Sequence, residues 1–365
     1  MDIEREYREA VKYAEKNLAS AALFAFNSNV DFICRINSGF KAEGFPQELM
    51  PLVESIKRGE AREFKITKHA AEWIAESFSW REKRIGGQAG IMANAAAALG
   101  VKSFAYAAAL SEEQEKLFSK KVVVFGGAKG SPSRHFIFEF KKGTVFGGAA
   151  IPSSNRVIAS YDPANFKLKI SKKFALESAR IAPFVECAVI SGFHNLDDRI
   201  AADRIATTAR FVQEWRNRNP SIRVHLELGD FANKRVLRKT LDTLLPCINS
   251  VGMNEMEAED VIVAMGMHES EMEELADEVV VHEARGSMIY GKNKRASIVK
   301  AALFGHALAA FKAENGKDAS IAALKKFVEN RHEFFEFRGV PAIKVEPRFT
   351  VGLGDTFAAG FVLVK

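Results

Sequence analysis

Near the end of the chain, Gly352, Gly354 and Asp355 form a G-x-G-D turn that leads into small and apolar residues typical of a packed helix. Glycines let the backbone turn tightly and direct successive N–H groups into one concavity, where the following helix N-terminus adds roughly half a positive charge. Such a place suits an anion, and a carboxylate at its edge suits a general base. Together these residues predict phosphoryl transfer to a hydroxyl. A four-residue match also occurs in ordinary loops before helices, so this prediction needs support from the rest of the chain.

Other apolar runs end in polar residues of the kinds that bind ligands. These clusters are Asn27–Asp31, Ser191–His194, His225–Glu227 and Asn254–Glu257. Polar side chains at the carboxyl ends of parallel strands line the ligand crevice of an open α/β sheet. At residues 27–31 a capped turn is the alternative, because Asn and Asp favour turns. Arg84–Gly90 adds a Gly-Gly turn before a small-residue helix, with the spacing of neither a Walker loop nor a Rossmann fingerprint.

The elements that must position these clusters alternate between strands and helices. After a surface helix over 3–18 and a buried strand over 22–26, strands are predicted at 187–191, 223–228, 247–253, 278–282 and 288–290. Helices are predicted between and after them, at 199–218, 234–244, 255–265, 301–311 and 320–330. Strands separated by helices of this length predict a mostly parallel sheet with both faces covered.

Two stretches differ from this pattern and predict a second, smaller unit. Residues 36–80 are more polar, with candidate helices at 46–57 and 68–78 and a short strand at 64–67. Residues 120–156 are basic and consist of short alternating runs at 122–125, 135–140, 144–146 and 156–160, split by glycine and proline turns. Short alternating runs with such turns predict an antiparallel sheet.

Composition excludes several classes of protein. The 365 residues carry a net charge of +6, and 27% of them are charged. The three cysteines lie far apart without C-x-x-C spacing, which predicts a reducing cytoplasm, no disulfide framework and no cysteine zinc site. We expect no signal peptide and no membrane span. A mildly basic chain suits an anionic small molecule as well as nucleic acid, but the basic stretch lacks the ordered aromatic residues of a nucleic-acid stacking platform.

The cluster N-E-x-E at 254–257, combined with G-x-G-D, resembles the ribokinase-like sugar kinases. Five further stretches resemble the ADP-dependent branch of that superfamily, the archaeal-type ADP-specific glucokinases and phosphofructokinases. They are NSNVD at 27–31, RIGGQAGI at 84–91, HFIFEFKKGT at 135–144, NRVIASYD at 155–162 and H-x-E at 225–227. The likeness is spread from residue 27 to 361 and keeps the family's order.

The resemblance implies a ribokinase-like three-layer α/β sandwich with a mostly parallel central sheet and a smaller α/β lid domain. The large nucleotide-binding domain would comprise residues 1–35, 81–119 and 158–365. The lid would comprise residues 36–80 and 120–157.

The resemblance also implies a sugar site. Asn29 and Asp31 would bind sugar hydroxyls, and Gly87 and Gln88 would line the site. His135 would reach the sugar from the lid.

On the phosphate side, the resemblance makes Asp355 the general base. The backbone of Gly352, Leu353 and Gly354 would form the anion hole that binds the nucleotide phosphates. Arg156 would contact the phosphate from the lid.

For the metal, the resemblance implies Mg²⁺ held through water by Glu227 and Glu257, with Asn254 fixing the network and contacting the nucleotide. Mg²⁺ prefers oxygen ligands and retains several waters, so carboxylates suit it. Each residue alone also has a structural explanation; Glu257, for example, would be favoured in the first turn of its helix by the dipole.

The implied activity is transfer of the ADP β-phosphate to a sugar or sugar-phosphate hydroxyl. Fructose 6-phosphate is expected ahead of glucose, because Arg62 falls at or beside the position where a carboxylate marks glucose-using members. Glu283–Gly286 departs from the family wording near the nucleotide base, and the chain ends at Lys365 where members usually continue. Two alternatives therefore stay open: an ATP-dependent ribokinase-like sugar or nucleoside kinase, and a ligand-binding paralogue without turnover. The oligomeric state is not indicated.

Overall fold

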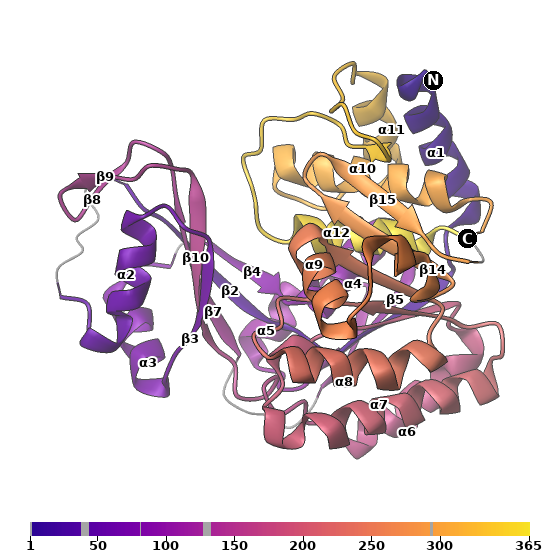
Figure 1. Ribbon diagram of the computed structural model, residues 1–365, viewed down its shortest axis with the longest axis horizontal. Coiled ribbons are helices and arrows are strands. Elements are labelled where there is room, and N and C mark those ends of the chain that lie inside the picture. Colours follow the sequence, from indigo (N-terminus) through magenta and orange to yellow (C-terminus); the bar gives the residue numbers. More distant parts are fainter. Residues whose placement is uncertain (1, 38–43, 81, 127–132, 293–294) are drawn as a thin grey trace.

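The computed structural model describes residues 2–37, 44–80, 82–126, 133–292 and 295–365. A larger lobe is built on a nine-stranded sheet and a smaller lobe on a five-stranded sheet. Figure 1 shows the smaller lobe projecting from one side of the larger one, which carries both chain termini.

The nine-stranded sheet is parallel except at one edge, as predicted. Its order is β16 (Val340–Pro341), β15 (Gly286–Tyr290), β14 (Glu278–Glu283), β13 (Ser250–Asn254), β12 (Arg223–Glu227), β11 (Cys187–Ile190), β1 (Ala21–Ala25), β5 (Lys102–Ala107) and β6 (Val122–Gly126). Within this described sheet, two pairs of neighbouring strands are antiparallel: β14 with β15, and β15 with β16. The central strands β1 and β11 are buried at every position, which explains their continuous apolar sequences.

Helices cover both faces of this sheet and complete the predicted three layers. One apolar core joins the sheet to α1 (Ile3–Asn17), α4 (Gln88–Ala98), α10 (Ile298–Asn315), α11 (Ile321–Glu329) and α12 (Leu353–Leu363). A second core on the opposite face contains α6 (Lys172–Ile181), α7 (Asp198–Arg218), α8 (Lys234–Leu244) and α9 (Glu255–Met265). α5 (Glu112–Leu117) and the 3₁₀ turns η2 (Ala182–Phe184), η3 (Phe193–Asn195), η4 (Leu245–Cys247) and η5 (Glu269–Glu274) complete the larger lobe. Within the described residues, none of these helices combines the length and apolarity required to cross a bilayer.

The five-stranded sheet is mixed, so the antiparallel pairing predicted for residues 120–156 describes only part of it. Its order is β3 (Arg62–Lys65), β10 (Asn155–Tyr161), β7 (Arg134–Phe140), β2 (Asn29–Arg35) and β4 (Glu82–Gly86). β7 pairs antiparallel with β10, but β2 pairs parallel with β7, and β3 pairs parallel with β10. The glycine and proline turns predicted pairings only between consecutive strands, whereas β2 and β3 come from distant parts of the chain, for which these turns do not set the strand direction. The same lobe holds the ribbon β8 (Val145–Phe146) and β9 (Ala149–Ala150), the turn η1 (Gln47–Leu49), and α2 (Met50–Lys57) and α3 (Lys68–Ser77).

Side-chain alternation gives the five-stranded sheet two different faces. Phe136, Phe138 and Val157 point into an apolar core with α2 and α3. Their neighbours along β7 and β10, such as His135 and Arg156, point to the opposite face and line a cavity between the lobes. Because successive strand residues face opposite sides, one sheet provides both a hydrophobic core and a binding surface.

The sheets divide the chain differently from the predicted boundaries. β2 and β4 were assigned to the large domain but pair within the five-stranded sheet, whereas β6 was assigned to the lid but pairs with β5. Short strands carry little information on which sheet they join, because pairing partners are set by tertiary contacts. Residues 38–43 and 127–132 of the predicted lid lie outside the described part.

Candidate active site

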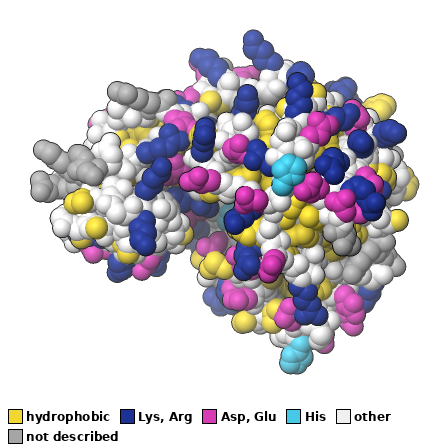
Figure 2. Space-filling view, turned by 90° about the horizontal axis from the view of Figure 1, so that it is seen from above, with side chains coloured by type: hydrophobic (Ala, Val, Ile, Leu, Met, Phe, Trp, Pro, Cys, Tyr) yellow, Lys and Arg dark blue, Asp and Glu magenta, His cyan; other side chains and the backbone are white. Residues whose placement is uncertain are grey.

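Two adjoining cavities lie where the lobes meet. The first, which we call the interlobe cavity, has a volume of about 270 Å³. Its lining comes from both lobes: Asn27, Asp31, Glu63, Gly87, Gln88, Ile91, His135, Ile137, Arg156, Ile158, His194, Gly229, Glu257, Val351, Gly352 and Asp355. Figure 2 shows the notch between the lobes, bordered by charged side chains of both signs.

One wall of the interlobe cavity is formed by β2 and the turn after β4. Asn29 is fully buried and donates from Nδ2 to Asp31 Oδ1 at 2.6 Å. Burial raises the pKa of Asp31 to about 6. Gly87 has a φ of +73°, and a Cβ there would come within 2.7 Å of the Asn27 carbonyl oxygen. Glycine is therefore required for the backbone to approach this wall.

Gln88 and two histidines complete this region. Gln88 donates to the Leu228 carbonyl and accepts from the Gly192 N–H at 3.1 Å, so it ties the start of α4 to two neighbouring loops. Burial alone would lower the pKa of His135, but Asp162, 3.3 Å away, and nearby carboxylates raise it to about 9. Burial lowers the pKa of His194, whose Nδ1 is buried without a hydrogen-bond partner. The pKa values of the two imidazoles that line this cavity are therefore shifted in opposite directions.

Asp355 lies in the first turn of α12, at the junction of the two cavities. Gly352 is the N-cap residue with φ +70°, and a Cβ there would meet Ile91 Cδ1 at 2.7 Å. The first N–H groups of a helix lack intrahelical acceptors, so this turn presents donors beside the cavity. Burial, followed by the charge of Glu227, raises the pKa of Asp355 to about 7. A carboxylate with that pKa accepts a proton readily near neutral pH.

Behind Asp355, two glutamates are held by different partners. Asn254 and Glu257 form a capping box at the start of α9, in which Glu257 Oε2 accepts from the Asn254 N–H at 3.0 Å. Burial raises the pKa of Glu257 to about 7. Glu227 is also buried, but His225 at 2.9 Å and His282 at 3.2 Å bring its pKa down to about 2.

These carboxylates fit a hydrated Mg²⁺. In the described part of the chain, no group of three or more His, Cys, Asp or Glu side chains is arranged to hold a metal directly. The charges of Glu227 and Asp355 both raise the pKa of Glu257. A cation nearby would relieve that repulsion. Mg²⁺ commonly uses one or two carboxylates, waters and substrate phosphates, which matches this sparse set of ligands.

The second cavity, which we call the large-lobe cavity, has a volume of about 460 Å³. Its walls include Asn254, His282, Leu353 and Gly354 near the interlobe cavity, and a mainly apolar end formed by Ala309, Ala310, Ala313, Ile343, Val345 and Phe357. Burial lowers the pKa of His306, which packs on Phe357 with ring centroids 4.5 Å apart, to about 3. A polar end and a flat apolar end suit a nucleotide, with phosphates toward Gly354 and a base against the alanines.

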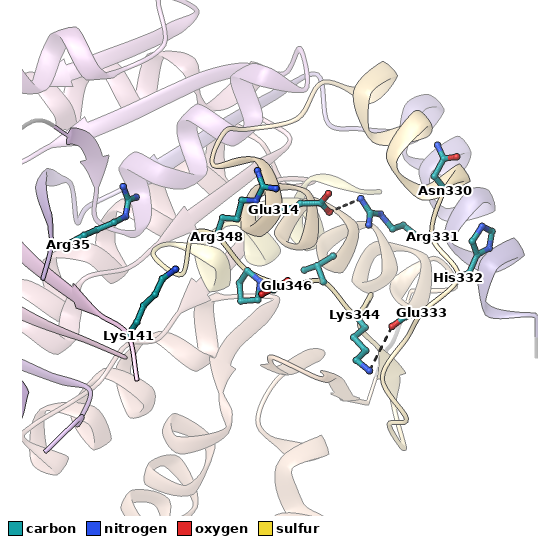
Figure 3. Close-up of a pocket in the computed structure, with 12 residues that line it drawn as sticks. Arg35, Lys141, Glu314, Asn330, Arg331, His332, Glu333, Lys344, Glu346 and Arg348 are labelled. Carbon is teal, nitrogen blue, oxygen red and sulfur yellow. Dashed lines mark hydrogen bonds and ion pairs between the residues drawn. The ribbon is translucent and has the colours of Figure 1, made fainter. Parts of the chain in front are cut away.

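A third, larger cavity of about 970 Å³ adjoins the large-lobe cavity, with which it shares Val345 and Pro347. Figure 3 shows Arg35, at the end of β2, and Lys141, directly after β7, on the small-lobe side of this cavity, opposite the segment that carries Arg348. This third cavity therefore lies between the small lobe and the segment over 330–348.

The structure brings most of the predicted site residues together. Asp31, Gly87, Gln88, His135, Glu257, Gly352 and Asp355 line the interlobe cavity, and Asn254, Leu353 and Gly354 line the large-lobe cavity. Arg156 lines both. Asn29 and Glu227 line neither; they lie behind Asp31 and His282, to which they hydrogen bond.

Sequence reasoning missed Glu63, His282 and His306, whereas His194 belongs to the strand-end cluster expected to line the crevice. Arg62, which was expected at or beside a sugar-selecting position, is exposed with its guanidinium 5.2 Å from the Phe64 ring centroid. Its neighbour Glu63 faces the interlobe cavity instead. A strand drawn from residue 62 would have placed these two side chains on opposite faces, but the predicted strand began at residue 64.

Comparison with known proteins places this geometry in a family. The sequence pattern of the family described as the ADP-specific phosphofructokinase/glucokinase conserved region matches residues 21–303. The chain belongs to this family. It is accordingly an ADP-dependent sugar kinase, a phosphotransferase with an alcohol group as acceptor.

Individual relatives extend over nearly the whole chain. The chain is 26% identical to the ADP-dependent glucose/glucosamine kinase of Pyrococcus abyssi, with 98% of each protein covered. It is also 26% identical to the ADP-specific phosphofructokinase of Pyrococcus horikoshii, with 93% of this chain and 96% of that protein covered. A solved ADP-dependent kinase in complex with fructose 6-phosphate and ADPβS superposes with a TM-score of 0.82 at 21% identity, covering 99% of this chain and 97% of that one. The predicted ribokinase-like fold is confirmed.

Proposed function

We propose that this kinase transfers the β-phosphate of ADP to a hydroxyl of a neutral hexose, with glucose as the first candidate. The observation that carries the choice of acceptor is the charge of the interlobe cavity. Its lining includes the carboxyl groups of Asp31, Glu63, Glu257 and Asp355. Carboxylates accept hydrogen bonds from sugar hydroxyls but repel a sugar phosphate.

Two basic side chains, Arg156 and His135, also line the interlobe cavity, but each has another partner or another proposed role. Arg156 also lines the large-lobe cavity, where it would meet the transferred phosphoryl group. His135 pairs with Asp162 at 3.3 Å. A relative named ADP-dependent glucose/glucosamine kinase, covered over 98% of its length, supports the same acceptor class. Fructose 6-phosphate is the second candidate, supported by the name of the Pyrococcus horikoshii relative.

In the proposed mechanism, Asp31 and Glu63 orient the hexose so that one hydroxyl lies against Asp355. Asp355 takes the hydroxyl proton as that oxygen bonds to the β-phosphorus. The bond from the β-phosphorus to the bridging oxygen breaks, and AMP leaves. Arg156 and the N–H groups of the turn at 352–354 stabilise the negative charge on the phosphoryl oxygens.

We further propose that the small lobe acts as the lid and that Mg²⁺ is required. The small lobe would exclude water, which would otherwise accept the phosphate in place of the sugar. Glu257 and Glu227 would hold the ion through water. When bound to the nucleotide, Mg²⁺ neutralises phosphate charge and polarises the transferring group.

The direct test incubates the protein with Mg²⁺ and either ADP or ATP, together with glucose, glucosamine or fructose 6-phosphate, and measures AMP and ADP by chromatography. We expect AMP from ADP that depends on glucose. Sugar-free reactions correct for AMP made by contaminating adenylate kinase. Turnover with fructose 6-phosphate alone would overturn the neutral-hexose proposal, and turnover with ATP alone would overturn the choice of donor.

Glu63→Gln should raise KM for glucose and lower kcat/KM by roughly 10- to 100-fold, the effect of weakening a hydrogen bond to a charged group. Glu63 faces the interlobe cavity and also accepts from Ser160 Oγ. Glu60→Gln is the matched control, because Glu60 is exposed and pairs with Arg58. Equal glucose kinetics in the two variants would exclude Glu63 from sugar binding.

Glu257→Gln should raise the Mg²⁺ concentration needed for half-maximal activity by about tenfold or more, since neutral side chains bind hydrated Mg²⁺ weakly. Glu259→Gln, on the exposed side of α9, is the control. Magnesium titrations at saturating ADP and glucose provide the measurement. A curve for Glu257→Gln that overlies the control would remove Glu257 from the metal site.

A further inference from the structure

Phe349 lies between the lobes, three residues before Gly352. Its ring centroid is 4.5 Å from the guanidinium carbon of Arg84 and 5.6 Å from that of Arg35. Both arginines belong to the small lobe, on β4 and β2. These distances are within the range of a cation–π interaction.

The large lobe holds Phe349 from the other side. The N–H groups of Arg348 and Phe349 both donate to the Ala313 carbonyl in α10, at 2.9 and 3.1 Å. The ring packs against Gly316 at the end of α10 so closely that a Cβ would collide with it. Phe349 is therefore fixed to the larger lobe by its backbone while its ring meets the smaller lobe.

A hydrogen bond and three ion pairs extend this contact. Thr350 Oγ1 donates to Glu139 Oε1 at 3.2 Å. Glu139 pairs with Arg35 at 3.3 Å, and Glu82 pairs with both Arg35 and Arg84. Arg35 and Arg348 both line the third cavity, which Figure 3 shows, so this contact lies beside that cavity.

On both sides of this contact, adjacent residues line the interlobe cavity. On the small-lobe side, Arg84 is the strand partner of Asp31, and β4 runs on into Gly87. On the large-lobe side, Thr350 is followed by Val351 and Gly352, which line the cavity. The contact thus joins the wall that would hold the sugar to the turn that would hold the phosphate.

We propose that Phe349 is a positioning residue: its ring, held by Arg84 and Arg35, fixes the G-x-G-D turn relative to the sugar-binding wall. This inference rests on the proposed function, in which the interlobe cavity binds the acceptor sugar. The reacting oxygen and phosphorus come from opposite sides of the junction. A misplacement of about 1 Å between such groups lowers the rate by about 10²-fold.

The test uses Phe349→Leu, Arg84→Met and the double variant. Leucine keeps an apolar side chain on Gly316 but removes the aromatic face. We expect Phe349→Leu to lower kcat for glucose-dependent AMP formation by about 10- to 100-fold, with AMP affinity in calorimetry within twofold of wild type. Arg84→Met should have a similar effect, and the double variant should be little worse than either single variant, because both remove one interaction.

Two further variants separate positioning from stability. Phe349→Tyr keeps the aromatic face and should therefore have the kcat of the wild-type protein. Phe327→Leu removes another cation–π contact, with Arg331 at 4.1 Å in the region of α11, and should leave kcat unchanged. Additive losses in the double variant, wild-type kcat in Phe349→Leu, or a parallel loss of AMP affinity would each overturn the inference.

Failure of the proposed function gives a different result, because wild-type protein would then form no glucose-dependent AMP. Hydrogen–deuterium exchange tests the contact without turnover. Faster exchange at 82–86 and 350–354 in Phe349→Leu, but not in Phe327→Leu, supports the inference. Unchanged exchange in those segments overturns it.

Discussion

Asp355→Asn is expected to lower kcat by about 10²- to 10⁴-fold, the usual contribution of a general base. Asparagine keeps the size of the side chain but cannot take the hydroxyl proton. The nucleotide contacts proposed for the large-lobe cavity do not require this proton transfer, so AMP affinity should remain within a few-fold of wild type. Glucose-dependent AMP formation and calorimetry with AMP measure the two effects separately.

The matched control for this prediction is Asp242→Asn, an exposed carboxylate on α8 that pairs with Arg238. It should have wild-type kcat. If Asp355→Asn retained more than about a tenth of wild-type kcat, Asp355 would not be the base. A matching loss of AMP affinity would instead indicate damage to the fold of α12.

Arg156→Met is expected to lower kcat by about 10²- to 10³-fold, the effect of removing one donor that stabilises transition-state charge. Arg156 is placed to do this because it lines both cavities from β10. Arg156→Lys keeps the charge but loses the planar fork, so it should recover only part of the rate.

Arg180→Met serves as the control, since Arg180 is exposed on α6 and pairs with Glu177. Initial rates at saturating ADP and glucose should distinguish the variants. A KM effect for glucose with unchanged kcat would reassign Arg156 to sugar binding. Equal kcat in Arg156→Met and wild type would remove it from the reaction.

The sequence predicted the larger lobe well because its elements are long and regular. Helices such as α7 and α9 bury one side against a parallel sheet. The helical spacing of their apolar residues can therefore be recognised from the local sequence alone. The clusters at strand ends could be assigned to one crevice because parallel strands bring their carboxyl ends to the same edge.

The smaller lobe was harder to predict, for physical reasons. Its strands are short, and their partners come from distant segments, as in the parallel pairing of β2 with β7. Glu63 shows the effect of an uncertain strand start, because the predicted strand began at residue 64 whereas β3 begins at Arg62, so the prediction gave Glu63 no face of the sheet. The support that Asn29 and Glu227 provide from behind the cavities could not be read from spacing, since it depends on hydrogen bonds made only in the fold.

Because the five-stranded sheet has two different faces, acceptor preference can change during evolution with little effect on the core of the small lobe. Positions 63, 137 and 158 face the cavity, whereas Phe136, Phe138, Val157 and Ala159 belong to the core with α2 and α3, and Phe64 packs against it. If the interlobe cavity binds the acceptor as proposed, a substitution at a cavity-facing position alters what the pocket recognises and leaves the packing that stabilises the lobe in place. Relatives with the same scaffold can therefore diverge in the sugar they phosphorylate through a few exchanges on one side of a sheet, without passing through an unstable intermediate.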